Sequence, residues 1–95
     1  MAGEAFEWDE AKRLTNIQKH GIDFVTAMRA FTDPRSFEYR SPIGEPEQRC
    51  VLIGAVEGRV IAVVYTIRNG AIRLISARRA RRNEYDRWAK NESSD

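Results

Sequence analysis

Arginine residues dominate the side chains of this sequence that could do chemistry. Arg49, Arg68 and Arg73 lie in or beside three strand-like segments, and Glu47 precedes the first of them. If two-residue turns join these segments, Arg49 and Arg73 both lie opposite Thr66. By the same count, Glu47 lies opposite Arg68. Side chains two residues apart share a face, so the arginines converge at one end of one sheet face and favour a bound phosphate, unless Glu47 and other acidic residues neutralise them.

A second group of arginines comprises Arg78, Arg79, Arg81 and Arg82, at the start of a predicted C-terminal helix. The helix dipole disfavours cations in a first turn by about 0.3–1 kcal/mol each. We expect an external polyanion to compensate this cost, and the alternative is a solvated basic face. At helical spacing, Arg78 and Arg82 would reach one phosphate together.

The single histidine, His20, has a side chain that titrates near neutral pH. It is therefore a candidate general acid or base, or a ring that stacks on a nucleobase. The alternative, which we favour at this point, is that His20 and Lys19 complement the dipole at the C-terminal end of a helix. Trp8 and Tyr85 are candidates for stacking on bases, although aromatic residues at element ends more often line the core.

Several catalytic motifs are absent from the sequence. It contains no glycine-rich phosphate loop, no HExxH and no carboxylate cluster dense enough for two magnesium ions. Cys50 is the only cysteine, which excludes an internal disulfide and a multi-cysteine metal site. We therefore predict that any phosphate chemistry needs neither metal nor cofactor.

The charge distribution also indicates a phosphate-bearing or acidic partner. The 95 residues carry a net charge of +2, but residues 1–47 sum to −3 and residues 48–90 to +7, and 13 of the 16 cations are arginines. The length allows one domain, 1–95, with tails expected at 1–5 and 91–95. No apolar run approaches the roughly 20 residues that span a bilayer, and no signal peptide is evident, so we expect a cytoplasmic protein without a membrane partner.

Two helices are predicted in the N-terminal half. Asp9 is a suitable N-cap for the first, after a short strand at 6–8, and Gly21 ends it. Ala11, Leu14, Ile17 and Gln18 share one side of this helix, and Lys12, Asn16, Lys19 and His20 lie on the other. Asp23 caps the second helix, whose apolar stripe is Phe24, Ala27, Met28 and Phe31.

Strands and a last helix are predicted in the remainder. An edge strand is expected at 36–40, three sequential strands at 48–56, 59–68 and 71–78, and a helix at 79–90. Asn69-Gly70 is a strong hairpin signal and Glu57-Gly58 a weaker one. The middle strand is almost continuously apolar, which is typical of a central strand covered on both sides.

The hairpin count also assigns apolar residues to the two sheet faces. Val51, Val64 and Ile75 are predicted to lie side by side, followed by Ile53, Ala62 and Ala77. The opposite face carries Leu52, Val63, Tyr65, Ile67, Ile72 and Leu74. From the last helix, Ala80, Tyr85 and Trp88 are expected to dock on the sheet.

Several segments together resemble the BrnT family, over about residues 6–88. They are Phe6-Glu7-Trp8-Asp9-Glu10-Ala11-Lys12, Asn16-x-x-Lys19-His20-Gly21-Ile22-x-Phe24, Phe31-x-Asp33-Pro34, Glu47-x-Arg49, Ile53-Gly54, Val64-Tyr65-Thr66-x-Arg68 and Arg73-Leu74-Ile75-Ser76-Ala77-Arg78-Arg79-Ala80. Trp8-Asp9-x-x-Lys12, Asn16-x-x-Lys19-His20-Gly21 and Ile75-Ser76-Ala77-Arg78 are specific in combination. One local difference is Glu45-Pro46-Glu47-Gln48-Arg49, which leaves either Glu45 or Glu47 as the acidic residue, with the spacing to Arg49 favouring Glu47.

The resemblance implies the ribonuclease toxin of a type II toxin–antitoxin pair. It implies an α+β, RelE-like fold, with two N-terminal helices and a C-terminal helix packed on a small antiparallel sheet, over about residues 6–90. It also implies an RNase that stops translation and is held inactive by a ribbon-helix-helix, BrnA-like antitoxin. Operator DNA would be reached only through that antitoxin.

A RelE-like RNase drives the ribose 2′-hydroxyl onto the neighbouring phosphate, which requires a base, an acid and cations. The resemblance makes Arg49, Arg68 and Arg73 candidates for phosphate stabilisation. Glu47, His20 and Lys12 are candidates for proton transfer, and the sequence does not choose among them. Arg78, Arg79, Arg82, Lys19, Trp8 and Tyr85 are candidate RNA-binding residues. The alternatives are a non-catalytic nucleic-acid-binding module and a protein-interaction domain that uses the arginine-rich face.

Overall fold

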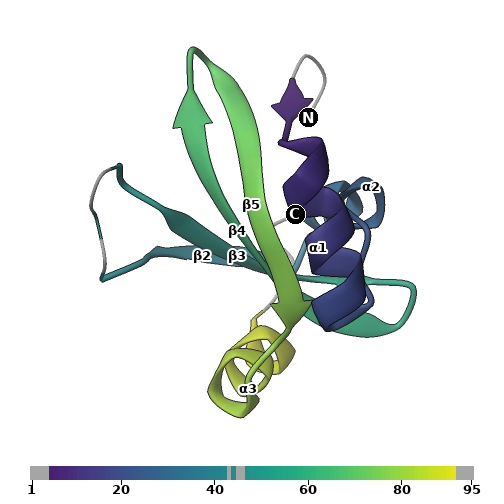
Figure 1. Cartoon of the computed structure of the whole chain (residues 1–95). Coiled ribbons are helices and arrows are strands. Elements are labelled where there is room, and N and C mark those ends of the chain that lie inside the picture. Colours follow the sequence, from purple (N-terminus) through teal and green to yellow (C-terminus); the bar gives the residue numbers. More distant parts are fainter. Residues whose placement is uncertain (1–4, 43, 45–46, 92–95) are drawn as a thin grey trace.

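The computed structural model describes residues 5–42, 44 and 47–91. In chain order the elements are β1 (Phe6–Glu7), α1 (Glu10–His20), α2 (Phe24–Ala27), the 3₁₀ helix η1 (Met28–Thr32), β2 (Phe37–Arg40), β3 (Cys50–Val56), β4 (Arg59–Arg68), β5 (Ala71–Arg79) and α3 (Arg82–Lys90) (Figure 1). The predicted α+β class is therefore confirmed. Except for Ala5 and Asn91, the expected tails lie outside the described residues, as does Glu45.

The strands form one five-stranded sheet in the order β1-β5-β4-β3-β2. β4 is central and β2 is an edge strand, as predicted. The sheet is mixed rather than antiparallel, because β1 pairs in parallel with β5 through Phe6↔Ile72 and Glu7↔Arg73. The resemblance implied an antiparallel sheet, which is wrong for this pair of strands, because β1 and β5 lie far apart in the sequence and no hairpin turn joins them.

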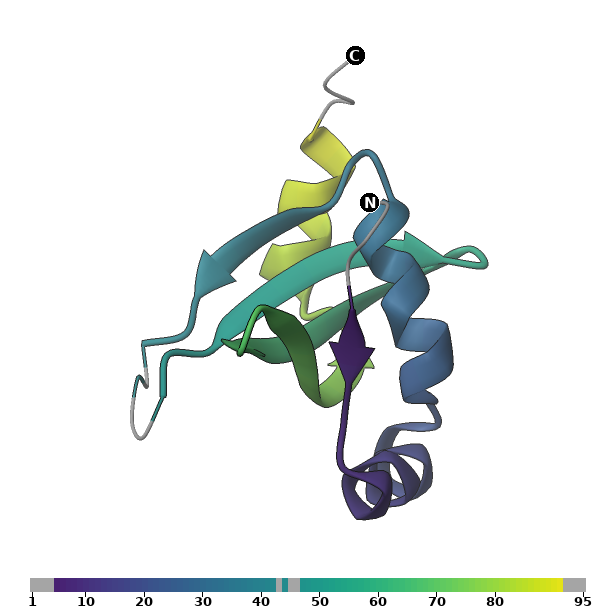
Figure 2. The ribbon, with the colours of Figure 1, turned by 90° about the horizontal axis from the view of Figure 1, so that it is seen from above.

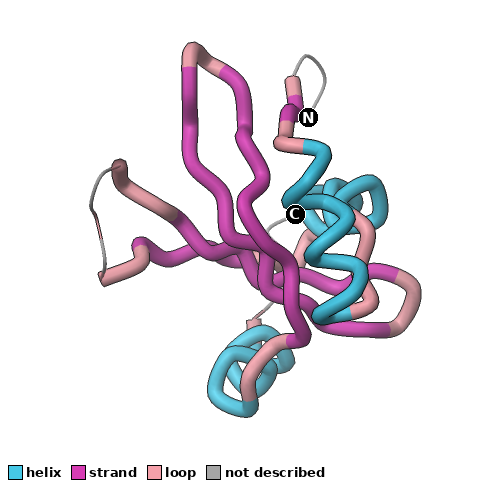
Figure 3. The backbone as a smooth tube through the Cα atoms, in the orientation of Figure 1, coloured by secondary structure: helices cyan, strands magenta, loops and turns pink. Residues whose placement is uncertain are grey.

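Helices cover both faces of the sheet (Figure 2). One face, here called the α1/α2 face, buries Leu52, Val63 and Leu74 against residues that include Phe24 and Ala27 of α2. On the opposite face, here called the α3 face, three buried residues (Val51, Ile53 and Ala62) pack with Ala80 and Trp88. The turn that joins β4 and β5 lies at the end of the hairpin that is far from α3 (Figure 3). Helix α3 therefore covers only part of the α3 face of the sheet.

Helix α1 begins and ends at the predicted residues, and α2 begins after the predicted cap. The Asp9 side chain accepts a hydrogen bond from the Ala11 N–H at 2.8 Å, and Gly21 ends α1 with a φ of 70°, a left-handed conformation that glycine adopts at little cost. Asp23 caps α2 in the same way. The second predicted helix is α-helical only as far as Ala27 and continues as η1.

The orientation of α1 on the sheet was not predicted from the sequence. Asn16 is 5% exposed whereas Leu14 is 51% exposed, so the side of the helix that carries Asn16 faces the protein. The Asn16 amide donates to the carbonyls of Ile22 and Ala77, each at 2.9 Å, and accepts from the Ala77 N–H at 3.0 Å. These bonds satisfy the backbone of β5 beyond the end of β1. The Asn16 side chain thus bonds to the backbone of β5 as a neighbouring strand would, which an apolar side chain cannot do.

Both predicted hairpin turns are confirmed. Glu57-Gly58 and Asn69-Gly70 have positive φ at both positions, which matches the twist of the flanking strands. Across β3 and β4 the register is the predicted one, and in the second hairpin it holds for Thr66↔Arg73. The register then shifts between Val64 and Tyr65.

This shift is a β-bulge that leaves Ile75 unpaired, and it overturns part of the predicted face assignment. Val64 pairs with Ser76 instead of Ile75, and Ala62 pairs with Arg78 instead of Ala77. One extra residue exchanges the faces of every position that follows it in the strand. Ala77 is therefore buried on the α1/α2 face, and Arg78 points to the α3 face.

The C-terminal helix starts later than predicted, so the proposed run of arginines in its first turn is wrong. β5 continues to Arg79, and the Ala80 N–H still donates to the Val60 carbonyl at 3.1 Å. The Glu84 carboxylate then accepts from the Arg81 N–H at 2.7 Å, which fixes the start of α3. Only Arg82 of the four lies in the first turn.

The docking of α3 on the sheet is as predicted for two of three residues. Ala80 and Trp88 pack on the α3 face, whereas Tyr85 is 47% exposed. Asp33, which ends η1, fixes the helix from the other side, because its carboxylate accepts from the Trp88 indole N–H and from the Ala55 N–H, each at 2.7 Å.

Candidate functional site

The predicted arginine cluster forms at the end of the sheet farthest from α3. Arg73 lies opposite Thr66 in the ladder, and the Thr66 hydroxyl donates to the Gln48 carbonyl at 2.7 Å. That bond holds the segment before β3, and with it Arg49, against β4. Arg68 forms an ion pair with Glu47 at 3.3 Å, so the predicted juxtaposition of these two residues is confirmed.

Arg49 differs from the other arginines of this cluster in its hydrogen bonding. Its Nε atom is buried and, among the described residues, has no hydrogen-bond partner. A buried donor without an acceptor costs about 1–3 kcal/mol, more when the group is charged. An anion that enters the site and accepts from Nε would recover this free energy.

Glu7 is a carboxylate of this site that the sequence analysis did not single out. It lies on β1, directly opposite Arg73, and its carboxylate is 3.0 Å from the Arg73 guanidinium. Parallel pairing between residues 66 positions apart leaves no turn in the sequence to count from. The alternation of apolar Phe6 with polar Glu7 was the only available signal.

The arginine cluster therefore holds two acidic and three basic side chains, Glu7, Glu47, Arg49, Arg68 and Arg73, at one sheet end, here called the basic sheet end. The two ion pairs are partly exposed, so water and salt weaken them. Partly exposed arginines of this kind can exchange a carboxylate for a phosphate at little cost.

Lys12, Lys19 and His20 come together in a groove of about 320 Å³ between α1 and β5. The groove also contains Ile75 and Ser76, the residues at and after the bulge. The predicted grouping of these three residues on one side of α1 is thus correct, and the structure adds that this side adjoins β5. All three side chains are exposed.

A second basic groove, of about 460 Å³, lies between the β3–β4 turn and α3. It contains Arg79, Arg82 and Tyr85 from the predicted set, together with Arg59 at the start of β4. Arg82 is 92% exposed and forms only a 3.6 Å pair with Asp86. Guanidinium groups beside an exposed aromatic ring are the combination that binds phosphates and stacks bases.

Arg78, another predicted RNA-binding residue, lines neither groove and instead binds Glu84. Its guanidinium donates to both carboxylate oxygens of Glu84, at 2.8 and 3.0 Å, and Tyr39 donates to the same carboxylate. Burial alone raises the pKa of Glu84, but the hydrogen bonds from Arg78, the Arg81 N–H and Tyr39 outweigh it and lower the pKa to about 2. The predicted helical pair of Arg78 with Arg82 does not exist, because Arg78 lies in a strand.

Trp8 lies at the margin of the core. Its ring contacts the edge of Phe24, with ring centroids 6.0 Å apart, and it packs against the main cluster of buried residues. A role for Trp8 in base stacking stays a prediction of the sequence alone.

Taken together, the fold and the site define a small α+β protein with an arginine-rich surface. The sequence model of the family described as "Ribonuclease toxin, BrnT, of type II toxin-antitoxin system" matches residues 8–84. The chain belongs to this family, whose type II toxins act on RNA and have an antitoxin partner. A comparison with curated proteins found no match. In the part of the chain that the structure describes, no helix is long and apolar enough to cross a membrane.

Proposed function

We propose that this protein is a metal-independent endoribonuclease toxin with a RelE-like fold. It inhibits translation by cleaving RNA, and a ribbon-helix-helix antitoxin neutralises it. The observation that carries this proposal is the buried Nε of Arg49, which has no partner among the described residues and lies at the same end of the sheet as Arg68 and Arg73. A phosphate is the anion that such a set of planar donors fits best.

The reaction that this site supports is attack of the ribose 2′-oxygen on the adjacent phosphorus. A base takes the 2′-hydroxyl proton, and the bond from phosphorus to the 5′-oxygen breaks as an acid protonates that oxygen. The products are a 2′,3′-cyclic phosphate and a free 5′-hydroxyl. The guanidinium groups of the basic sheet end stabilise the negative charge that develops on the phosphate oxygens.

Two groups of side chains are available for proton transfer. Glu47 and Glu7 lie at the basic sheet end, each held by an arginine, and are candidates for the base. His20 and Lys12 line the groove between α1 and β5 and are candidates for the acid. RNA is the substrate rather than DNA because the reaction needs the 2′-hydroxyl.

The rest of the RNA follows β5 in this proposal. The strand passes from Arg73 at the basic sheet end, past the groove that contains Lys19, to the groove that contains Arg79, Arg82 and Tyr85. The six residue steps from Arg73 to Arg79 span roughly 20 Å. These flanking contacts bind phosphates and bases on either side of the cleaved bond.

The test is RNA cleavage by the purified, partner-free protein in excess EDTA. An Arg49→Ala, Arg68→Ala double variant removes the phosphate site, and Arg29→Ala removes an arginine from a comparable ion pair, with Glu57 at 2.8 Å, as a control. We expect the wild type and Arg29→Ala to leave 2′,3′-cyclic phosphate ends and the double variant to be inactive.

Three other outcomes would contradict the proposal. Salt-sensitive RNA binding without cleavage by the wild type would indicate the non-catalytic binding module. Failure to bind RNA at physiological salt would indicate the protein-interaction domain. Equal cleavage by all three proteins would show that the activity comes from a contaminant or that the site lies elsewhere.

A further inference from the structure

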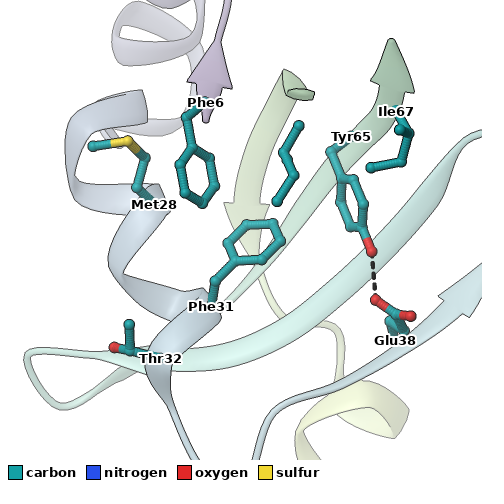
Figure 4. A pocket seen from close by; sticks show the side chains of 8 residues that line it. Phe6, Met28, Phe31, Thr32, Glu38, Tyr65 and Ile67 are labelled. Atoms are coloured by element: carbon teal, nitrogen blue, oxygen red, sulfur yellow. Dashed lines mark hydrogen bonds between the residues drawn. The ribbon is translucent and has the colours of Figure 1, made fainter. Parts of the chain in front are cut away.

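A pocket of about 310 Å³ lies on the α1/α2 face (Figure 4), away from the arginines. It is lined by Phe6, Met28, Phe31, Thr32, Glu38, Tyr65, Ile67 and Ile72 and is called the Tyr65 pocket below. Tyr65 and Thr66 are neighbours in β4, and neighbouring side chains of a strand point to opposite faces. A molecule in this pocket therefore does not occupy the basic sheet end.

The interior of the Tyr65 pocket is mostly apolar and contains ring-to-ring contacts. The Phe31 ring contacts Phe6 and Tyr65 edge to face, with ring centroids 5.2 Å apart in both cases. Ile67 lies at the opening and is 59% exposed. The volume is at the low end for ligand pockets, which suits one bulky side chain rather than a cofactor.

Glu38 supplies the acidic side of the opening. The Tyr65 hydroxyl donates to its Oε1 atom, as the dashed line in Figure 4 shows. Burial, together with this hydrogen bond, raises the pKa of Tyr65, so the hydroxyl stays a donor at physiological pH. Among the described residues no cation forms an ion pair with Glu38, so its carboxylate is available to a cation from outside and disfavours RNA phosphates.

We propose that the Tyr65 pocket is an anchor site for the antitoxin. A segment of the antitoxin inserts one apolar side chain over Phe31 and Ile67, and a lysine or arginine next to it pairs with Glu38. Buried apolar anchors flanked by such pairs carry most of the affinity in protein interfaces. The inference rests on the antitoxin partner of the family and does not depend on which residues cleave RNA.

The experiment measures the affinity of the full-length protein for the antitoxin encoded beside it, by titration calorimetry. Ile67→Asp places a charge at the apolar opening, and Glu38→Lys reverses the charge of the acidic side. The matched controls are Val25→Asp, at another half-exposed aliphatic residue, and Glu57→Lys, at another surface carboxylate. The RNase activity of each partner-free variant is measured in parallel.

We expect Ile67→Asp and Glu38→Lys each to weaken antitoxin binding at least tenfold, and the controls to stay within threefold of the wild type. RNase activity without antitoxin should be unchanged in all four variants. Wild-type affinity in both pocket variants, or an equal loss in the controls, would overturn the proposal. If the proteins bind antitoxin as expected but none cleaves RNA, the proposed ribonuclease fails while this inference stands.

Discussion

The buried carboxylate of Glu84 links α3 to the sheet, and its replacement by glutamine has a calculable effect on stability. The Glu84 side chain is 4% exposed and that of Arg78 is 19% exposed, so water screens their ion pair little. The pKa of about 2, against an ordinary value of 4.5, corresponds to about 3 kcal/mol of stability, at about 1.4 kcal/mol per unit. Removal of one partner from a buried ion pair costs about 3–5 kcal/mol, which agrees.

The pH dependence has a definite sign. Because folding lowers the pKa of Glu84, its contribution is complete above the unfolded value of 4.5 and is lost as the pH falls toward 2. At neutral pH we expect Glu84→Gln to lower the free energy of unfolding by about 3 kcal/mol, which corresponds to a melting temperature about 12–24 °C lower for a chain of this size. The difference in the free energy of unfolding between Glu84→Gln and the wild type should become smaller as the pH falls from 4.5 to 2.

Denaturant unfolding at pH 7 and at pH 3 measures both effects. Asp86→Asn is the matched control, since its carboxylate is 53% exposed and lies 3.6 Å from an exposed arginine. We expect it to change stability by less than about 0.5 kcal/mol. Two results would refute the reasoning. One is a decrease in the free energy of unfolding of less than about 1 kcal/mol for Glu84→Gln at pH 7. The other is a difference in this free energy between variant and wild type that is as large at pH 3 as at pH 7.

Three further predictions concern other parts of the molecule. Asn16→Leu should lower the free energy of unfolding by about 2–4 kcal/mol in denaturant titrations, because buried backbone groups of β5 lose their partners; a change below 1 kcal/mol would contradict this. Asp33→Ala should cost about 2–3 kcal/mol in the same assay and shift the fluorescence of Trp88, whose indole N–H loses its acceptor; an unchanged spectrum would be evidence against the contact. Arg68→Ala should lower by about 0.7 the slope of log affinity against log salt for an uncleavable 2′-O-methyl RNA; an unchanged slope would place the phosphate elsewhere.

The features that local rules determine were predictable from the sequence. Asp9 and Gly21 bound α1 because caps depend on neighbours within one helical turn. Asn69-Gly70 fixed the turn and the register of Thr66 with Arg73, and so placed Arg73 in the site.

The features that were missed depend on contacts between distant residues. The orientation of α1 follows from one asparagine that bonds to the backbone of Ala77, which no periodicity of apolar residues indicates. Glu7 enters the site through a parallel strand of only two residues. Arg78 stands where the predicted strand 71–78 meets the predicted helix, and its pairing with Ala62 and its ion pair with Glu84 place it in the strand.

The bulge at Ile75 makes the length of β5 as important as its composition. A substitution changes one side chain, whereas one residue inserted after Ile75, with the bulge unchanged, would move every later residue of the strand to the other side of the sheet. Arg78 would then lie opposite Ile61 on the α1/α2 face, and its pair with Glu84 would be lost. Loss of Ile75 would instead remove the bulge and leave Ser76 opposite Val64. We therefore expect working copies of this fold to tolerate changes of residue type, or loss of the unpaired residue, more readily than an insertion between Leu74 and Ala77.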